Sequence, residues 1–229
     1  MSYDKRQASV EFQRWSESYD RCVLQWLLFR PTHKAVLKRL EARFGERPFR
    51  LLDVGCGTGQ FMERVRARFP KAEVCGVDLS GPMVRQGAVR WGRQFAHTLP
   101  VQGDSERLPF ADDCFDAITC AHSFHHYPHQ ERAVVEMHRV LRPGGRLLLI
   151  DGNRDFVWGW FIYDVCVAAV EGAVHHCSGK RFRALTTDAG FELEEQKGHW
   201  GPAPFLVTEA VKPLDRPTIP LREPYRAVA

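Results

Sequence analysis

The sequence contains no paired cysteine motif, no long apolar run and no apolar segment at its N-terminus. Its seven cysteines are scattered, and no two of them form a C-x-x-C pair. Scattered thiols are typical of a reducing compartment and exclude a disulfide framework. No uninterrupted apolar run approaches the ~20 residues that span a bilayer, and the polar N-terminus lacks a signal-peptide core. We therefore expect a cytoplasmic protein without a membrane span.

The chain also lacks a dense cluster of basic residues, an internal repeat and a low-complexity block. It has 32 lysines and arginines against 28 acidic residues, a formal net charge of +4. So small an excess, without a Lys/Arg cluster, gives no reason to expect a nucleic-acid partner. With 229 residues, 44% hydrophobic and 26% charged, the chain suits one α/β domain with extra segments. The sequence leaves its oligomeric state open.

The stretch from Leu51 to Phe61 organises the rest of the chain. An apolar run carries Asp53 near its end and is followed by glycines at alternate positions, 55, 57 and 59. Apolar residues at four-residue spacing then begin with Phe61, as in a helix. This pattern predicts a buried strand, a tight turn and a helix N-terminus, the usual start of a nucleotide site. The glycines allow the backbone to approach a ligand closely, because no Cβ intervenes.

Asp53 helps to distinguish the two cofactors that such a turn accepts. Dinucleotide sites usually space their glycines G-x-G-x-x-G, so that the helix N-terminus receives a pyrophosphate. Here the spacing is G-x-G-x-G, and Asp53 would repel a pyrophosphate but attract an ammonium group. The string resembles motif I of class I S-adenosylmethionine (SAM) methyltransferases, whose glycine loop passes under the methionine portion of the cofactor. An NAD site remains the alternative at this point.

Two further strands are expected to end in acids. Residues 72–78 form an apolar segment that ends at Asp78, and residues 99–103 lead to Asp104. Because the carboxyl ends of parallel strands meet at one edge of a sheet, three acids there suit a nucleoside. Asp78 is able to take both ribose hydroxyls, whichever cofactor binds, and Asp104 can accept from the adenine amino group. NAD sites do not usually require the third acid.

The motifs that follow complete the resemblance. Leu108 to Asp116 match the pattern LPF-x-x-x-x-FD, and Arg139 to Gly145 give R-V-L-R-P-G-G before an apolar strand. Residues 51–151 thus carry the motifs in order, and the chain is identified as a member of the class I SAM-dependent methyltransferases, similar to the ubiquinone/menaquinone-biosynthesis and related small-molecule group. The resemblance implies a Rossmann-like α/β fold with a seven-stranded mixed sheet, parallel except for its last strand, and helices on both faces. It also implies cofactor contacts from Tyr19, Asp53, Gly55, Cys56, Gly57, Gly59, Asp78, Leu79, Met83, Asp104, Ser105 and Ala121.

The resemblance and the hydrophobic spacing together divide the chain into segments. Residues 1–48 show apolar residues at helical spacing and are expected to form an N-terminal helical cap. Residues 49–212 would form the SAM-binding domain, in which 152–190 cover the substrate, and residues 213–229, with four prolines, an extended tail. The secondary structure expected outside the motifs comprises helices over 32–44 and 129–141, a turn over 142–146, a strand over 147–150, an aromatic-rich helix over 156–176, and strands over 191–197 and 204–211.

The function that the resemblance implies is methyl transfer from SAM to a small acceptor, through in-line displacement at the sulfonium methyl. Aromatic residues crowd positions 156–163, and we expect part of them, with Trp15 or Trp26, to line or cover a cavity for a hydrophobic or aromatic acceptor. The acceptor atom, O, C or N, stays open.

Methylation of nucleic-acid bases is disfavoured, because the fourth strand lacks an Asn/Asp-Pro-Pro-Tyr/Phe motif. The alternatives are an NAD-dependent oxidoreductase and a SAM-binding partner protein without catalysis.

Histidines supply the candidate catalytic groups. His122 and His125 follow the fourth strand, next to the expected position of the methyl group, and histidine suits removal of a proton near neutral pH. We expect His125 to act as the base, with His122 as the second candidate and His126 facing the core. No metal is expected, because the histidines at 122–129 and 175–176 show no regular structural-zinc spacing.

Overall fold

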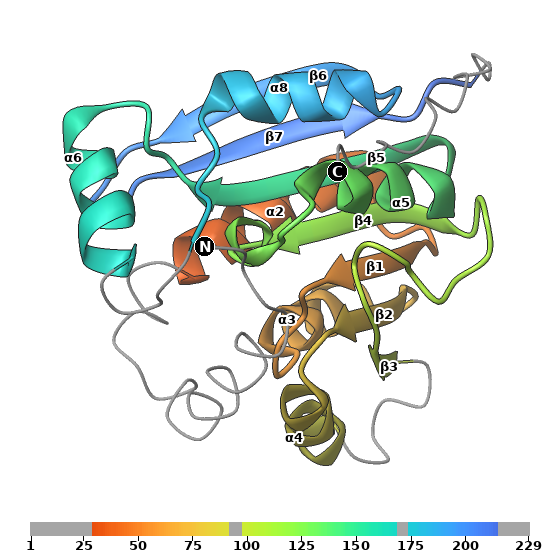
Figure 1. Ribbon diagram of the computed structural model, residues 1–229. Coiled ribbons are helices and arrows are strands. Elements are labelled where there is room, and N and C mark those ends of the chain that lie inside the picture. Colours follow the sequence, from red (N-terminus) through yellow and green to blue (C-terminus); the bar gives the residue numbers. More distant parts are fainter. Residues whose placement is uncertain (1–28, 92–97, 169–173, 215–229) are drawn as a thin grey trace, which may run out of the picture.

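The computed structural model describes residues 29–91, 98–168 and 174–214 of the chain. Within these residues, seven strands form one mixed sheet in the order β3-β2-β1-β4-β5-β7-β6 (Figure 1). Neighbouring strands from β3 to β5 pair in parallel, whereas β7 is antiparallel to both β5 and β6. The predicted fold class is therefore confirmed. The strands are β1 (Arg50–Val54), β2 (Glu73–Asp78), β3 (Thr98–Gln102), β4 (Phe115–Ala121), β5 (Leu141–Gly152), β6 (Glu192–His199) and β7 (Phe205–Val211).

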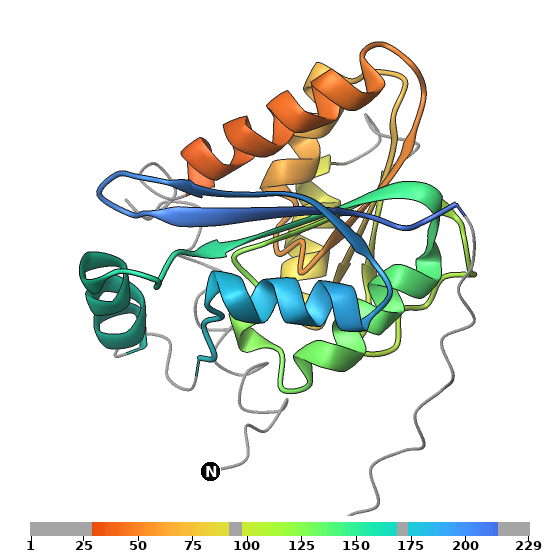
Figure 2. The same cartoon turned by 90° about the horizontal axis from the view of Figure 1, so that it is seen from above.

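Helices cover both faces of this sheet (Figure 2). One face packs against α5 and α8, and the opposite face packs against α2 and α3. Consecutive strand residues alternate between the two cores, so that Leu147 lies in the first core and Leu148 in the second. Burial on both faces accounts for the nearly continuous apolar runs that marked the parallel strands in the sequence. The helices are α2 (Arg30–Phe44), α3 (Gln60–Arg68), α4 (Gly81–Trp91), η3 (Phe124–His126), α5 (Gln130–Val140), α6 (Val157–Trp160), η4 (Phe161–Val167) and α8 (Gly179–Asp188).

The strand order creates a switch point between β1 and β4. From β1 the chain moves outward through β2 to β3, and it then returns to place β4 on the other side of β1. In open α/β sheets, ligands bind in the crevice outside the carboxyl ends of the strands at such a point. The glycine loop after β1 lies at this position.

The helix predicted over residues 32–44 is present as α2 (Arg30–Phe44). Its Val36 and Leu40 are buried in the same core cluster as Phe61 and Val65 of α3. This part of the predicted N-terminal cap therefore packs directly on the sheet. Tyr19, Trp15 and Trp26, for which contacts were expected, lie outside the described residues.

The turn predicted over 142–146 is wrong, because these residues belong to β5. Leu141 pairs with Phe115 and Arg146 pairs with Ala117, so residues 142–145 bulge out of the ladder with β4. The backbone N–H of Gly144, at φ +74°, donates to the carbonyl of Lys212 at 2.7 Å. The Lys212 N–H returns a bond to the carbonyl of Gly145 at 3.1 Å. Pairing with the chain just beyond β7 thus extends the strand through the glycines.

The aromatic-rich helix predicted over 156–176 is also only partly present. The chain forms the short helix α6, followed by the π-helical segment η4, and residues 174–178 are irregular. The start of α6 lies tight against the preceding loop, since a Cβ at Gly159 would be 1.8 Å from the carbonyl oxygen of Asn153. In the described part of the chain, no helix is both long and apolar enough to cross a membrane.

Candidate functional site

A cleft opens at the carboxyl ends of β1, β2 and β4, beside the switch point. It encloses about 840 Å³, its open mouth included, which is within the range of small-molecule sites. A smaller cavity of about 400 Å³ continues it toward α3 and shares Gly55, Gly57 and Ala121 with it. Among the predicted cofactor contacts, the cleft is lined by Gly55, Gly57, Asp78, Leu79, Met83, Asp104, Ser105 and Ala121, and the smaller cavity also by Asp53 and Cys56. Gly59 lines neither space.

The glycine loop is held in a conformation that other residues rarely adopt. Gly55, Gly57 and Gly59 have φ angles of +75°, +54° and +76°. A Cβ at Gly55 would lie 2.2 Å from the Ser123 Oγ, whereas a Cβ at Gly57 would meet no atom within 4 Å. The N–H groups of Gly55 and Cys56 both donate to the carbonyl of Val77, at 2.8 and 3.1 Å. The loop is thus fixed to the end of β2 and open at Gly57.

Asp78 lies at the end of β2 and is oriented by the backbone around it. Its Oδ2 accepts the N–H of Gly57 at 2.8 Å, and its Oδ1 accepts the N–H of Ser80 at 2.8 Å. Burial raises the pKa of Asp78, and the two backbone N–H groups oppose that effect. Each carboxylate oxygen has a second lone pair. Asp78 can therefore still accept two hydroxyls from a ligand in the cleft.

Asp53 is the buried acid of the smaller cavity. Its side chain is only 4% exposed, and its Oδ1 accepts the hydroxyl of Thr119 at 2.6 Å. Burial raises its pKa to about 7, helped by the nearby Asp78 and opposed by the Thr119 hydrogen bond. Within the described residues, no basic side chain forms an ion pair with it. A carboxyl group of this kind is suited to the ammonium group of a ligand.

Asp104 and Ser105 lie on the turn after β3. The Oδ1 of Asp104 accepts the N–H of Glu106 at 3.0 Å, and its carbonyl accepts the N–H of Arg107 at 3.0 Å. These bonds fix the turn along the side of the cleft. The structure thus brings all three predicted acids to one edge of the sheet, two in the cleft and Asp53 in its continuation.

The histidines after β4 differ from their expected orientation. His122 and His126 line the cleft, whereas His125 is buried and does not. The expectation that His126 faces the core is wrong, because η3 is a 3₁₀ turn with about three residues per turn rather than an alternating strand. Burial lowers the pKa of His122 to about 4. Its Nε2 has no hydrogen-bond partner in the part of the chain that the structure describes.

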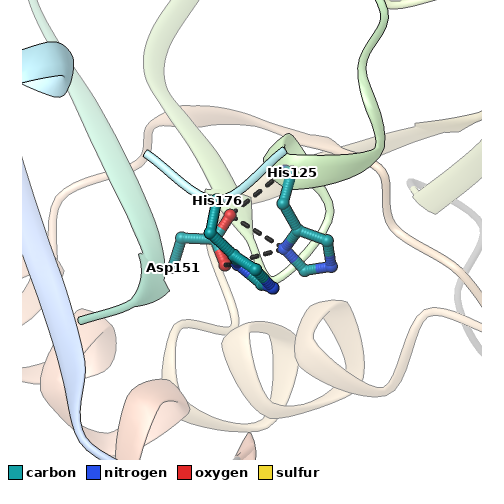
Figure 3. A group of neighbouring side chains, drawn as sticks. All are labelled: His125, Asp151 and His176. Carbon is teal, nitrogen blue, oxygen red and sulfur yellow. Dashed lines mark hydrogen bonds and ion pairs between the residues drawn. The ribbon is translucent and has the colours of Figure 1, made fainter. Parts of the chain in front are cut away.

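His125 is instead bound to Asp151, near the end of β5 (Figure 3). Its Nδ1 lies 2.8 Å and 2.9 Å from the two carboxylate oxygens, and its backbone N–H donates to Oδ2 at 3.1 Å. Burial alone would raise the pKa of Asp151, but His125 and His176 hold it well below its usual range. Sequence reasoning missed Asp151, although an acid at the end of a strand was the signal that identified Asp53 and Asp78.

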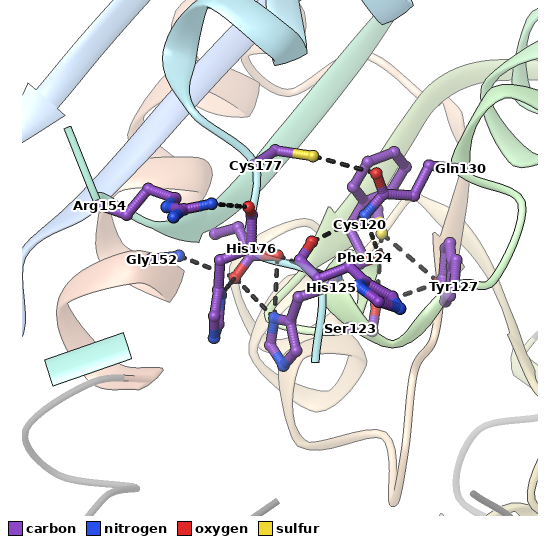
Figure 4. Close-up of polar contacts among 12 residues, drawn as sticks. Cys120, Ser123, Phe124, His125, Tyr127, Gln130, Gly152, Arg154, His176 and Cys177 are labelled. Carbon is purple, nitrogen blue, oxygen red and sulfur yellow. Dashed lines mark hydrogen bonds and ion pairs between the residues drawn. The ribbon is translucent and has the colours of Figure 1, made fainter. Parts of the chain in front are cut away.

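A polar network beneath the glycine loop was also missed (Figure 4). The Ser123 hydroxyl donates to the carbonyl of Val54 at 3.1 Å and lies 3.1 Å from the Tyr127 hydroxyl. The Cys120 sulfur lies 3.2 Å from the Ser123 Oγ. Ser123 and Tyr127 also line the cleft, so this network fixes the end of β1 against the loop after β4.

The aromatic residues after β5 do not line the cleft or its continuation. Trp158, Trp160 and Phe161 are 53%, 47% and 44% exposed, whereas Tyr163 is buried. Since residues 1–28 are not described, a cavity formed with Trp15 or Trp26 stays a prediction.

A glycine loop at the switch point, with acids at the ends of β1 and β2 and after β3, defines a nucleoside-binding α/β protein. A family model described as a methyltransferase domain matches residues 52–149. The predicted resemblance to class I SAM-dependent methyltransferases is confirmed over these residues. The NAD-dependent alternative is not favoured.

Curated relatives carry methyltransferase names. Demethylmenaquinone methyltransferase of Deinococcus radiodurans is 38% identical over 104 residues, which cover 45% of this chain and 43% of the relative. The ubiquinone/menaquinone biosynthesis C-methyltransferase of Methylobacterium nodulans is 43% identical over 107 residues, covering 46% and 42%. Demethylmenaquinone methyltransferase of Listeria welshimeri is 31% identical over 153 residues, covering 65% and 64%. The chain thus spans less than two thirds of the length of each of these relatives.

Solved structures share the fold at low sequence identity. A SAM-dependent methyltransferase from Thermotoga maritima gives a TM-score of 0.68 at 23% identity, covering 88% of this chain and 98% of the other. The cyclase SpnF gives a TM-score of 0.65 at 22% identity, covering 79% and 81%. Since a protein named as a cyclase shares the fold, the fold alone does not determine the reaction.

Proposed function

We propose that this protein transfers a methyl group from SAM to a small-molecule acceptor. The observation that carries the proposal is the convergence of the glycine loop, Asp53, Asp78 and Asp104 on one cleft and its continuation at the switch point. The methyltransferase domain match over residues 52–149 and the names of the curated relatives support it.

The residues of the cleft fit each portion of this cofactor. Asp53, buried and without a basic partner in the described structure, suits the ammonium group of the methionine portion. Asp78, already fixed by two backbone N–H groups, retains lone pairs for the two ribose hydroxyls. Asp104 and Met83 line the part of the cleft that would hold the adenine. The open space over Gly57 leaves room for the chain between these portions.

When bound, SAM supplies an electrophilic methyl group on a sulfonium centre. The protein's contribution would be position and exclusion of water, since a transfer between two held partners gains mainly from orientation. The loop is suited to this, because its N–H groups, the Asp78 carboxylate and the Ser123 hydroxyl already hold it in one conformation.

If the acceptor is a hydroxyl or an acidic carbon, a proton must leave. His125, the first candidate, binds Asp151 through its Nδ1 and does not line the cleft, so we propose that His122 accepts the proton. Its pKa of about 4 keeps the ring neutral at pH 7, the form that accepts a proton. An oxygen that gains a methyl group becomes strongly acidic, so even a weak base can take its proton. His122→Gln should lower kcat at an oxygen acceptor about 100-fold and leave the affinity for SAM unchanged. Full turnover in that variant would remove His122 from the mechanism.

We propose a hydrophobic or aromatic metabolite, such as a quinone precursor or a phenol, as the acceptor. The curated relatives are named for demethylmenaquinone and for ubiquinone and menaquinone biosynthesis. The apolar and histidine side chains around the cleft suit a flat, poorly hydrated molecule better than a charged polymer.

Calorimetric titration of the full chain with SAM, S-adenosylhomocysteine and NAD tests the cofactor. Binding of the first two and not of NAD is expected, and Asp78→Asn should weaken it at least tenfold. Turnover against a panel of phenols, quinols and amines, followed as S-adenosylhomocysteine formed, then tests the reaction. Binding without turnover on any acceptor would favour a non-catalytic partner protein, and tighter binding of NAD would overturn the proposal.

A further inference from the structure

His125, Asp151 and His176 meet in a buried cluster outside the lining of the cleft (Figure 3). They come from three separate places: η3, the end of β5, and the segment before α8. One ligand-type atom from each lies within 4.8 Å of the other two. The nearest pairs are the Nδ1 of His125 at 2.8 Å, and the Nδ1 of His176 at 3.7 Å, from the Oδ1 of Asp151.

His176 is the unusual member of this cluster. It is 6% exposed, and within the described structure neither of its ring nitrogens has a hydrogen-bond partner. The 3.7 Å separation of its Nδ1 from Asp151 is too long for a hydrogen bond. A buried polar group left without a partner is unfavourable, because it has lost its hydrogen bonds to water without replacing them. Its Nδ1 nevertheless faces the carboxylate of Asp151. An ion bound between this nitrogen and the carboxylate would give the nitrogen a partner.

Asp151 gives the same indication. It is 1% exposed, and both of its carboxylate oxygens lie within 2.9 Å of the Nδ1 of His125. Within the described structure, no lysine or arginine pairs with it, and its ionic neighbours are the two histidines. A buried carboxylate requires a compensating charge, and a cation held by both imidazoles would supply it.

Hydrogen bonds fix the backbone segments that carry the two histidines, and one also fixes the carboxylate of Asp151 (Figure 4). The N–H of His175 donates to the carbonyl of His125 at 2.8 Å, and the Arg154 side chain donates to the carbonyl of His176 at 2.9 Å. The Gly152 N–H donates to the Oδ1 of Asp151 at 2.7 Å. Supporting bonds of this kind fix ligand orientation in metal sites.

We propose that His125, Asp151 and His176 bind a divalent transition-metal ion of the Zn²⁺ class, through the two Nδ1 atoms and one carboxylate oxygen. In a tetrahedral zinc site with bonds of about 2.0 Å, neighbouring ligand atoms lie about 3.3 Å apart. The separations of 2.8 and 3.7 Å from the Oδ1 of Asp151 lie on either side of this value. Two imidazoles and one carboxylate leave at least one coordination position for water or another oxygen ligand.

This proposal does not rest on methyl transfer, and it gives His125 a ligand's role in place of the base role predicted from sequence. The sequence contained no metal signal because the ligands are 26 and 25 residues apart along the chain, from 125 to 151 and from 151 to 176. Only folding brings them together. The proposed ion would lie close to the cleft. His126 lines the cleft, and the centroid of its ring is 4.1 Å from that of the His125 ring.

The test is a Co²⁺ titration of the metal-depleted, untagged full chain, followed by visible absorption, with zinc content measured on chain purified without chelator. About one equivalent of Co²⁺ with tetrahedral absorption is expected, displaced by Zn²⁺. His176→Gln and Asp151→Asn should weaken Co²⁺ binding at least tenfold. His129→Gln is the matched control, since His129 is exposed and outside the cluster, and it should bind as the wild type does.

Two outcomes would overturn the proposal. One is a folded wild-type chain that takes up no stoichiometric Co²⁺ and whose melting temperature does not rise with Zn²⁺, since a ligand of the native state must stabilise it. Such a result would leave Asp151 and His125 as a buried ion pair. The other is His176→Gln, folded by circular dichroism, with wild-type Co²⁺ affinity. Because these readouts require neither SAM nor an acceptor, they are independent of the proposed function.

Discussion

Replacing Asp53 by asparagine tests the electrostatics of the cofactor cleft most directly. Asp53 is buried, and its pKa is raised to about 7, chiefly by burial. If the carboxylate pairs with the ammonium group of the cofactor, only the ionised form binds well. Affinity should then fall as protons compete below pH 7. The Asn variant keeps the shape and the contact with Thr119, but it loses the charge.

The magnitude follows from that pKa. With a pKa of about 7, the ionised fraction falls about eightfold between pH 7.5 and pH 6, so the wild-type Kd for S-adenosylhomocysteine should rise about eightfold. Loss of a hydrogen bond to a charged group is worth about 1.5–3 kcal/mol, so Asp53→Asn should weaken binding at pH 7.5 by roughly 10- to 150-fold. Its remaining affinity should no longer change with pH.

Stability gives a second readout that needs no cofactor. An acid whose folded-state pKa is raised binds a proton in the folded chain that the unfolded chain has already lost. Stability must therefore fall as pH rises from about 4 to about 7. Between pH 5 and pH 8 the loss from Asp53 amounts to at most about 3 kcal/mol, and Asp53→Asn should remove it.

Isothermal titration calorimetry at pH 6 and 7.5 and urea unfolding at pH 5 and 8 measure these effects. Asp104→Asn is the matched control, since it changes another acid of the cleft but leaves Asp53 in place, and it should keep the pH dependence of the wild type. A pH dependence that persists in Asp53→Asn would assign the titration to another group, such as Asp78, and would refute the reasoning.

Three further predictions concern the loop and the packing. Asp78→Ala should weaken SAM binding by roughly 1.5–3 kcal/mol, and unchanged affinity by calorimetry would remove Asp78 from the site. Gly55→Ala should destabilise the fold by about 3 kcal/mol, because the new Cβ would lie 2.2 Å from the Ser123 Oγ. Gly57→Ala has open space around its Cβ, so it should lower stability only by the ~1–2 kcal/mol that a positive φ angle costs an alanine. Equal melting temperatures for the two variants would contradict this. Lys212→Met should lower the free energy of unfolding by about 3–5 kcal/mol, because the buried ammonium group pairs with Asp113 at 2.6 Å. An unchanged free energy of unfolding in urea would show that the pair is dispensable.

The sequence by itself determined the sheet and the framework of the cofactor cleft. Residues 51–61 and the acids Asp78 and Asp104 follow one another along the chain, and each acid stands at or just after a strand end. Strand, turn and helix signals are local, and parallel strands align their carboxyl ends whatever the details of packing. Position along the chain was therefore enough to bring these residues to one edge.

Tertiary structure decided the features that depend on contacts between distant segments. The 3₁₀ turn after β4 directed His126 to the cleft and His125 to Asp151, and no periodicity of the sequence specifies such a turn. Residues 142–145 joined β5 because the chain just beyond β7, far away in sequence, pairs with them. His176 reaches Asp151 because hydrogen bonds hold its segment beside η3. A side chain's direction is set by all the elements packed around it, and the sequence of its own segment encodes only one of them.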